Sequence, residues 1–482
     1  MDYAVLAGVL GRVLVAVSVS LLLPLATALY YREAWFPFGC TLLIGLAAGL
    51  VLVRLGRKAG EIYRREGYYI VALAWIGVSL LGSLPYLLAG TFTAFVDAFF
   101  ETVSGFTTTG ASVMTDVEVH GRAILLWRSL TQWLGGMGIV VLTLALLSLV
   151  KAGGLHILQA EVPGPRIERL KPKMADTARL LWLLYTLISA AEIISLWSAG
   201  MPFYDAVVHS FTTMATGGFS PKNASIGFYP TPLIHWLVIL FMFLAGTNFA
   251  LYYTALRRRR ASVFWSDPEF RFYCLLLLAA GSAVSLELYI KGLYAGEELF
   301  RKAFFQVVSV MTTTGFATAD FDHWPSFSRH LLLLLMFVGG CYGSTGGAIK
   351  VGRILLLAKH TLLELRRIVH PRAVLRVTWG REQAVPNEVV VSVLNFVGLY
   401  ALAAGAGVAG LSALAGSDLD TSVSAVAATL GNVGPGLGAV GPTQNYAHLP
   451  AAAKYLLCFL MLFGRLEIYP LLCLFHRQGW SR

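Results

Sequence analysis

The chain has 482 residues, of which 57% are hydrophobic and only 13% are charged. Soluble proteins carry about a quarter charged residues, so this composition excludes an ordinary soluble domain and indicates an integral membrane protein in the lipid bilayer. A net charge of +11 would suggest a nucleic-acid partner in a soluble protein. In a membrane protein, basic residues gather in the cytoplasmic loops, which accounts for that charge, and no nucleic acid is expected as a partner.

Hydropathy predicts about ten membrane spans. The first two lie near residues 4–30 and 37–55. Asp2 and Arg12 are unlike the start of a cleaved secretory signal, so we interpret the first apolar run as a retained span. The remaining spans lie near residues 68–90, 122–150, 178–199, 231–256, 270–291, 328–358, 387–413 and 451–475.

Four apolar segments between these spans are too short to cross a bilayer and are predicted to re-enter it as short helices. They lie near residues 94–106, 203–214, 299–311 and 420–430. Each ends in a run of small residues: TTTG at 107–110, ATGG at 215–218, TTTG at 312–315 and GNVG at 431–434. Non-helical backbone at membrane depth is tolerated only where protein buries it or where it lines an aqueous path. Four such segments predict four walls of one pore.

The candidate selectivity filter consists of residues from these four segments. In chain order they are Thr108, Thr109 and Gly110; Ala215, Thr216 and Gly217; Thr313, Thr314 and Gly315; and Asn432, Val433 and Gly434. Rings of backbone carbonyls can replace the water around a monovalent cation without a fixed charge that would trap it. Glycine lets the backbone adopt unusual conformations and approach the ion. The alternative is that small residues only allow tight helix packing, but four matched segments favour the pore.

A span with small residues at its centre follows each candidate filter. Gly136, Gly246, Gly340 and Gly464 mark these breaks, at similar distances from the preceding filters. The predicted fold is therefore an all-α integral membrane protein with four span–pore helix–span repeats in pseudo-fourfold arrangement around one pore. The expected boundaries are 1–66 for a two-span N-terminal extension, then 67–176, 177–268, 269–382 and 383–482 for the four pore repeats.

Basic residues predict the orientation of these spans. The loops 54–66, 151–179, 257–271 and 350–381, with the C-terminal tail, hold 26 of the 37 Lys and Arg residues. Because basic loops stay in the cytoplasm, both termini are expected there and all four candidate filters face outward. The Arg257–Arg260 run is interpreted first as a topology anchor, with a regulatory contact as the alternative.

Two features on the cytoplasmic side of the filters are candidates for a gate. The first comprises Gly339, Gly340, Gly343, Ser344, Thr345, Gly346 and Gly347. A helix persists poorly through so many glycines, at a cost of about 1 kcal/mol each, and a closely packed kinked helix is the alternative to a loop. The second is Arg465, deep within the last span, where a cation is costly unless it is hydrated or paired. A structural ion pair with Glu467 or another buried carboxylate is the alternative to a role in the pore.

These motifs resemble the Trk/Ktr/HKT superfamily of potassium transporters. Within it, the two-span extension and the total length fit the bacterial TrkH and TrkG membrane subunits. The resemblance implies potassium uptake across the bacterial inner membrane, with K+ as the transported ion and Gly110, Gly217, Gly315 and Gly434 in the filter. It also implies that the glycine-rich loop of the third repeat and Arg465 obstruct the pore.

The same resemblance implies a homodimer and a cytosolic nucleotide-binding regulatory subunit of the TrkA type. The chain has no Walker A motif and no GxGxxG after a strand, so nucleotide control is expected from that separate subunit. No organic cofactor and no catalytic site are expected in this chain.

The sequence can be compared with what three alternative functions would require. Superfamily members with serine at the first filter glycine tend to pass Na+, whereas glycine here favours K+; Na+-permeable or Na+- or H+-coupled transport in the same fold stays open. A broken-helix secondary transporter would have inverted repeats and charged substrate ligands. A membrane enzyme would need a nucleophile–base pair or a metal cluster, for which the sequence offers no motif.

Polar residues near the filters carry further expectations. Asp97 and Asp205 are expected to cap the first two re-entrant helices, and the third and fourth are expected to lack this acid. Glu101 and His209 are expected to form hydrogen bonds behind the filter rather than bind ions. The acids that follow the first and third filters either concentrate cations at the mouth or are solvated loop charges; they are Asp116, Glu118, Asp320 and Asp322.

Overall fold

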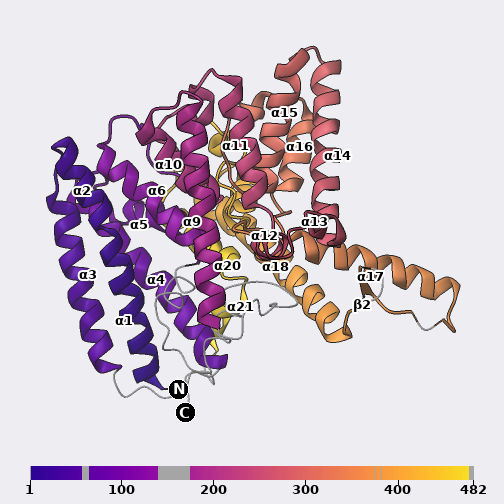
Figure 1. Ribbon diagram of the computed structural model, residues 1–482, viewed down its shortest axis with the longest axis horizontal. Coiled ribbons are helices and arrows are strands. Elements are labelled where there is room, and N and C mark those ends of the chain that lie inside the picture. Colours follow the sequence, from indigo (N-terminus) through magenta and orange to yellow (C-terminus); the bar gives the residue numbers. More distant parts are fainter. Residues whose placement is uncertain (1, 57–63, 139–173, 374, 381–382, 477–482) are drawn as a thin grey trace.

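The structure is a computed structural model that describes residues 2–56, 64–138, 174–373, 375–380 and 383–476 (Figure 1). Nearly all regular structure in these residues is helical. Their only strands are β1 (Thr378–Trp379) and β2 (Gln383–Ala384), which form one short antiparallel pair. The predicted all-α class is confirmed.

The helices follow the predicted order of span, re-entrant helix and span. The N-terminal extension comprises α1 (Tyr3–Ser20), α2 (Leu22–Tyr31) and α3 (Phe36–Leu55). The first repeat contains α4 (Arg64–Leu88), α5 (Phe95–Phe106) and α6 (Arg122–Gly136). The second contains α9 (Met174–Ser198), α10 (Phe203–Met214), α11 (Pro232–Ala245), α12 (Phe249–Arg258) and α13 (Ser262–Ser266).

The third repeat contains α14 (Pro268–Ile290), α15 (Gly296–Met311), α16 (Ser326–Leu335) and α17 (Val351–Val369). The fourth contains α18 (Asn387–Ala415), α19 (Leu419–Leu430), α20 (Ala451–Arg465) and α21 (Tyr469–Phe475). Short 3-10 turns lie in the segments that follow three of the re-entrant helices: Ser225–Phe228, Phe321–His323 and Gly438–Val440. In Figure 1, α1 and α3 stand at one edge of the molecule, and α17 projects from the opposite edge.

In each repeat the first helix of the second span ends at or near the small residues, as predicted. Within the described residues, six helices are long and apolar enough to cross a membrane unbroken, or up to seven segments if the bent pair α11 and α12 counts as one. That pair is bent by 89° at its break. The other three breaks follow α6, α16 and α20. The predicted continuation of the first of these spans to residue 150, and most of the basic loop 151–179, lie outside the described residues.

All four re-entrant helices carry an acid in the first turn, which corrects two expectations. Asp97 and Asp205 are the third residues of α5 and α10, not their caps. The third and fourth helices begin earlier than expected, and their first turns contain Glu297 and Glu298 in α15 and Asp420 in α19. A carboxylate near a helix N-terminus favours the positive end of the helix dipole, which stabilises each of these short helices.

The repeats contact one another around a common centre. Helix α6 packs against α10 of the next repeat, α11 packs against α15, and α20 packs against α5 of the first repeat. Because the last repeat contacts the first, the arrangement closes on itself. This is the predicted pseudo-fourfold architecture.

The two described ends of the chain meet at the start of α4. The Asp2 amide donates to Glu66 Oε1 at 2.9 Å, and the Tyr69 hydroxyl donates to the Cys473 carbonyl at 2.8 Å. Glu66 and Tyr69 are three residues apart, so α1 begins and α21 ends on the same side of the molecule.

Candidate functional site

The four re-entrant helices end in one shared backbone pattern. The residue after each helix C-cap has a positive φ: 53° for Thr108, 53° for Thr216, 60° for Thr313 and 55° for Asn432. Two residues further on, a glycine also has a positive φ: 83° for Gly110, 74° for Gly218, 81° for Gly315 and 105° for Gly434. Non-glycine residues seldom adopt such angles, so the pattern is a costly feature repeated four times.

This pattern corrects the alignment of the second filter by one residue. The Gly217 amide donates to the Thr212 carbonyl, just as the Thr109 amide donates to the Ser104 carbonyl. Gly217 therefore corresponds to Thr109, and Gly218 corresponds to Gly110. Ala215 is the helix C-cap. Sequence reasoning missed Gly218 because two adjacent glycines look alike; the signal that identifies it is its distance from the end of the helix.

These four glycines form a closed ring of contacts between repeats. A Cβ added to any of them would collide with a carbonyl oxygen of the following repeat. The collisions are with Gly217 O at 2.2 Å for Gly110, Thr314 O at 2.0 Å for Gly218, Val433 O at 2.0 Å for Gly315 and Thr109 O at 2.6 Å for Gly434. The ring runs through all four repeats and returns to the first, so four carbonyl-bearing segments surround one point.

A cavity of about 270 Å³ opens next to this ring. Its walls come from the segments that follow the filters, and it is lined by all four ring glycines, Gly110, Gly218, Gly315 and Gly434. Gly217 is not among its lining residues, which agrees with the corrected alignment. The arrangement can present backbone oxygens to a small cation that enters from this cavity.

A loop, residues 336–350, lies across the other side of the ring. It joins α16 to α17 without a helix, so the alternative of a kinked helix is wrong. All seven predicted gate residues between Gly339 and Gly347 belong to it. The Gly347 amide donates to Thr313 Oγ1 at 2.7 Å, so the loop contacts the start of the third filter segment, next to the end of α15. A Cβ on Gly347 would lie 2.5 Å from the Gly431 carbonyl oxygen, so the loop also touches the base of the fourth segment.

The loop also forms hydrogen bonds to the break between α11 and α12 in the second repeat. The Cys341 amide donates to the Gly246 carbonyl at 2.8 Å, and Thr345 Oγ1 donates to the Ala245 carbonyl at 3.2 Å. The loop thus contacts the second, third and fourth repeats. A cavity of about 80 Å³, lined in part by Gly346, Gly347 and Arg465, borders it.

Arg465 connects this loop to the first repeat. Its guanidinium donates to the Thr345 carbonyl at 2.7 Å and to the carbonyls of Gly135 and Gly136 at 2.7 and 2.9 Å. Glu467, the alternative partner, is bound by Arg353 at 3.0 and 2.5 Å. Arg465 therefore places its positive charge among backbone carbonyls at the level of the loop.

A profile of the family TrkH, described as cation transport protein, matches residues 41–480. The chain belongs to this family. It is 40% identical over 487 residues to "Trk system potassium uptake protein TrkH" of Salmonella typhimurium, with 100% of both chains covered. It is 38% identical to "Trk system potassium uptake protein TrkG" of Escherichia coli, with 96% of each covered.

A solved structure agrees with this assignment to the TrkH family. The crystal structure of the potassium transporter TrkH from Vibrio parahaemolyticus matches with a TM-score of 0.91 and 39% identity, and 100% of each chain is covered. The superfamily resemblance drawn from the filter and break motifs is thereby confirmed, and so is the fold.

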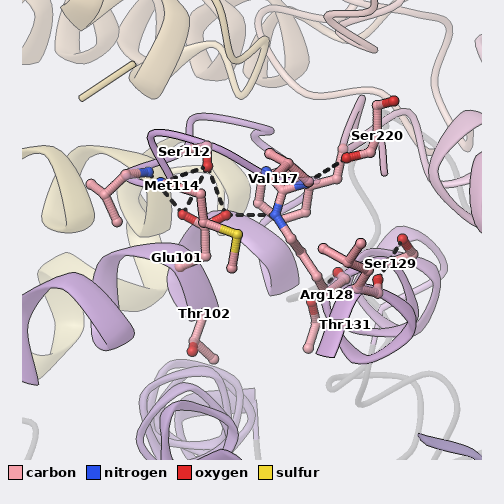
Figure 2. Close-up of polar contacts among 12 residues, drawn as sticks. Glu101, Thr102, Ser112, Met114, Val117, Arg128, Ser129, Thr131 and Ser220 are labelled. Atoms are coloured by element: carbon pink, nitrogen blue, oxygen red, sulfur yellow. Dashed lines mark hydrogen bonds and ion pairs between the residues drawn. The ribbon is translucent and has the colours of Figure 1, made fainter. Parts of the chain in front are cut away.

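A buried ion pair joins the first re-entrant helix α5 to α6, and Figure 2 shows its polar contacts. Glu101 Oε1 accepts from Arg128 Nε at 2.6 Å, and its other oxygen accepts from the Val113 amide at 2.9 Å. Arg128 also donates to the Ser220 carbonyl at 3.1 Å, across the boundary with the second repeat. In the second repeat His209 bonds to Ser220 Oγ at 3.0 Å. Glu101 and His209 thus form the hydrogen bonds expected of them.

Three of the four acids outside the first and third filters, Asp116, Glu118 and Asp320, contact a loop of another repeat. Asp116 accepts from Asn223 Nδ2 at 2.8 Å, and this hydrogen bond holds the pKa of Asp116 below its ordinary value. Glu118 lies 3.6 Å from Lys222 Nζ, and Asp320 accepts from Thr443 Oγ1 at 3.1 Å. Asp322 lies 3.4 Å from Arg329. These contacts place the acids in the loops around the cavity outside the filters, and whether they concentrate cations there stays a prediction.

Replacing Arg128 by leucine is expected to destabilise the protein strongly. Glu101 is completely buried, and breaking a buried ion pair by removing one partner costs about 3–5 kcal/mol. We expect a lower thermal unfolding temperature of the purified protein in detergent. The double variant Glu101→Gln with Arg128→Leu removes the unpaired charge and should regain part of the loss. An unfolding temperature equal to that of the wild type in Arg128→Leu alone would contradict this role.

Proposed function

We propose that the chain takes up K+ across the bacterial inner membrane through a channel-like pore. The observation that carries the proposal is the closed ring of four glycines, each against the carbonyl of the next repeat. The names of the matched relatives, which describe potassium uptake, support the same ion.

The proposed filter is the backbone from the first positive-φ residue to the ring glycine in each repeat. It comprises Thr108–Gly110, Thr313–Gly315 and Asn432–Gly434 as expected from the sequence, and residues 216–218 in the second repeat. Its carbonyls would replace part of the hydration shell of K+. Glycine at all four ring positions supports K+ as the favoured ion, and Na+-permeable transport in the same fold is the alternative.

The proposed gate is the loop 336–350 together with Arg465. The loop contacts the bases of two filter segments, and Arg465 adds a positive charge at the same level. Opening then requires the loop to leave these contacts. We propose that a homodimer of this chain works with a cytosolic nucleotide-binding subunit of the TrkA type; the naming of the relatives as components of a Trk system supports such a partner.

The proposed orientation places both termini in the cytoplasm and the filter toward the periplasm. The meeting of α1 and α21 at the start of α4 supports termini on one side, and the distribution of Lys and Arg supports the cytoplasmic side. The division at residues 66, 176, 268 and 382 into an extension and four repeats is part of the same proposal.

Radiotracer uptake into liposomes that contain the purified chain tests the function. We expect uptake of ⁸⁶Rb+ that is competed strongly by K+ and weakly by Na+ and Li+, and that changes when the regulatory subunit and nucleotide are added. Competition by Na+ as strong as that by K+ would favour the alternative, and uptake no greater than in empty liposomes would reject the proposal.

A further inference from the structure

One side chain of the first repeat is bound to the filter of the second. Gln132, completely buried on α6, donates from Nε2 to the Gly217 carbonyl at 2.7 Å. Its Oε1 accepts from the Phe219 amide at 3.1 Å. The two hydrogen bonds span Gly218, the ring glycine. Both polar atoms of the carboxamide are therefore used to hold the backbone on either side of that glycine.

The other three repeats carry a side chain where the second has Gly217; these residues are Thr109, Thr314 and Val433. Thr109 and Thr314 correspond to Gly217, and their hydroxyls bond to the hydroxyls of Thr107 and Thr312 at 2.7 and 2.8 Å. Gly217 has no side chain to do this. A Cβ on Gly217 would lie only 2.4 Å from Gln132 Cδ. Gln132 thus replaces, from a neighbouring repeat, the side chain that the second filter lacks.

The second filter also has the greatest need of support. It contains two adjacent glycines, which have more conformational freedom than any other pair of residues, whereas each of the other filters has one at these positions. The matching stretches of the other second spans, residues 240–245, 331–337 and 460–463, contain only apolar residues. We call the two hydrogen bonds from Gln132 the polar clamp. Among the second spans, a glutamine at this position occurs only on α6, the helix that contacts the two-glycine segment of the second repeat.

Arg128 extends the clamp by one helical turn. It lies four residues before Gln132 on the same face of α6, and its guanidinium stacks 3.5 Å from the centroid of the Phe219 ring. Arg128 also donates to the Ser220 carbonyl. Together, Arg128 and Gln132 on this face of α6 hold the backbone from Gly217 to Ser220.

We propose that Gln132 is a positioning residue that sets the cation selectivity of the second filter segment. By fixing the direction of the Gly217 carbonyl and the path of Gly218, it keeps the ring at the size that discriminates K+ from Na+. This inference rests on the proposed function. Gln132 itself does not touch the ion; it acts through the backbone.

The first test is Gln132→Met, which keeps most of the side-chain volume and removes both hydrogen bonds. We expect the ratio of K+ to Na+ permeability to fall about fivefold or more, while Rb+ uptake falls much less. The measurement is the competition assay in liposomes, together with reversal potentials in planar bilayers. Ser129→Ala, on the same helix but bonded only within it to the Leu125 carbonyl, is the matched control and should keep the ratio.

The second test is a rescue experiment that removes the side chain of Gln132 and adds one at Gly217. Gln132→Ala opens the space, and Gly217→Thr fills it with the residue found at Thr109 and Thr314. Each single variant is expected to lower the K+/Na+ ratio, because Gln132→Ala leaves Gly217 without a clamp and Gly217→Thr collides with Gln132. The double variant should recover the ratio to within about twofold of the wild type.

The outcomes separate this inference from the proposed function. If the folded Gln132→Met protein has the selectivity of the wild type, or if the double variant is no more selective than Gln132→Ala alone, the role of Gln132 is wrong while K+ uptake stands. If the wild-type chain itself shows no K+-selective flux, the proposed function fails instead.

Discussion

Replacing Arg465 by alanine is expected to raise cation flux about tenfold or more without changing the K+/Na+ preference. The guanidinium carries a full positive charge beside the loop, where low dielectric strengthens its repulsion of a passing cation. Each 1.4 kcal/mol removed from a barrier is worth about tenfold in rate. The variant also loses three hydrogen bonds that tie the loop to the first repeat, which favours the open state.

The preference between ions should be unaffected, because the hydrogen bonds of Arg465 go to the loop and to Gly135 and Gly136, not to the filter backbone. Flux is measured as ⁸⁶Rb+ uptake per folded protein, and preference is measured by competition with K+ and Na+. Arg465→Lys keeps the charge but only part of the hydrogen bonding, so it separates electrostatic repulsion from release of the loop. Unchanged flux in correctly folded Arg465→Ala would contradict a pore role for this arginine.

The periodic features of the sequence predicted most of the architecture. Four short helices and the four segments that follow them reappear in the structure, and so do the breaks of the second, third and fourth repeats in the part of the chain that is described. Each depends on local chemistry: the length of an apolar run relative to the bilayer, or its glycine content. The position of Arg465 within the last span was also evident from the sequence. Its three carbonyl partners were not, since they come from residues more than a hundred positions away.

The features that were missed depend on single-residue alignment or on contacts between repeats. To predict that Asp97 lies in the first turn and is not the cap, one must know the residue at which α5 begins, and composition does not define that residue. The clamp by Gln132 could not be predicted, because a glutamine in an apolar span gives no sign of which backbone it will contact. The choice between Gly217 and Gly218 was ambiguous because the sequence does not show where α10 ends; the hydrogen bonds at the end of α10 and the positive φ of Gly218 distinguish the two glycines.

That ambiguity leads to a prediction in which two adjacent glycines respond differently. Gly218→Ala is expected to reduce K+ uptake to less than about a tenth of the wild-type rate. The added methyl would lie 2.0 Å from the Thr314 carbonyl oxygen, which belongs to rigid backbone, and alanine at φ +74° adds strain of about 1–2 kcal/mol. Gly110→Ala meets the Gly217 carbonyl oxygen at 2.2 Å and should be comparably damaging.

Gly217→Ala should be much milder, with uptake retained and K+/Na+ discrimination reduced. The three atoms nearest to its methyl group all belong to the Gln132 carboxamide, at 2.4 to 2.7 Å, and the end of a flexible side chain can move where a backbone carbonyl cannot. The three variants are compared by Rb+ uptake at equal amounts of folded protein, with Na+ competition as the second measurement. If Gly217→Ala matched Gly110→Ala while Gly218→Ala transported normally, the second filter would follow the alignment suggested by the sequence, and the ring of Gly110, Gly218, Gly315 and Gly434 would not be the conducting constriction.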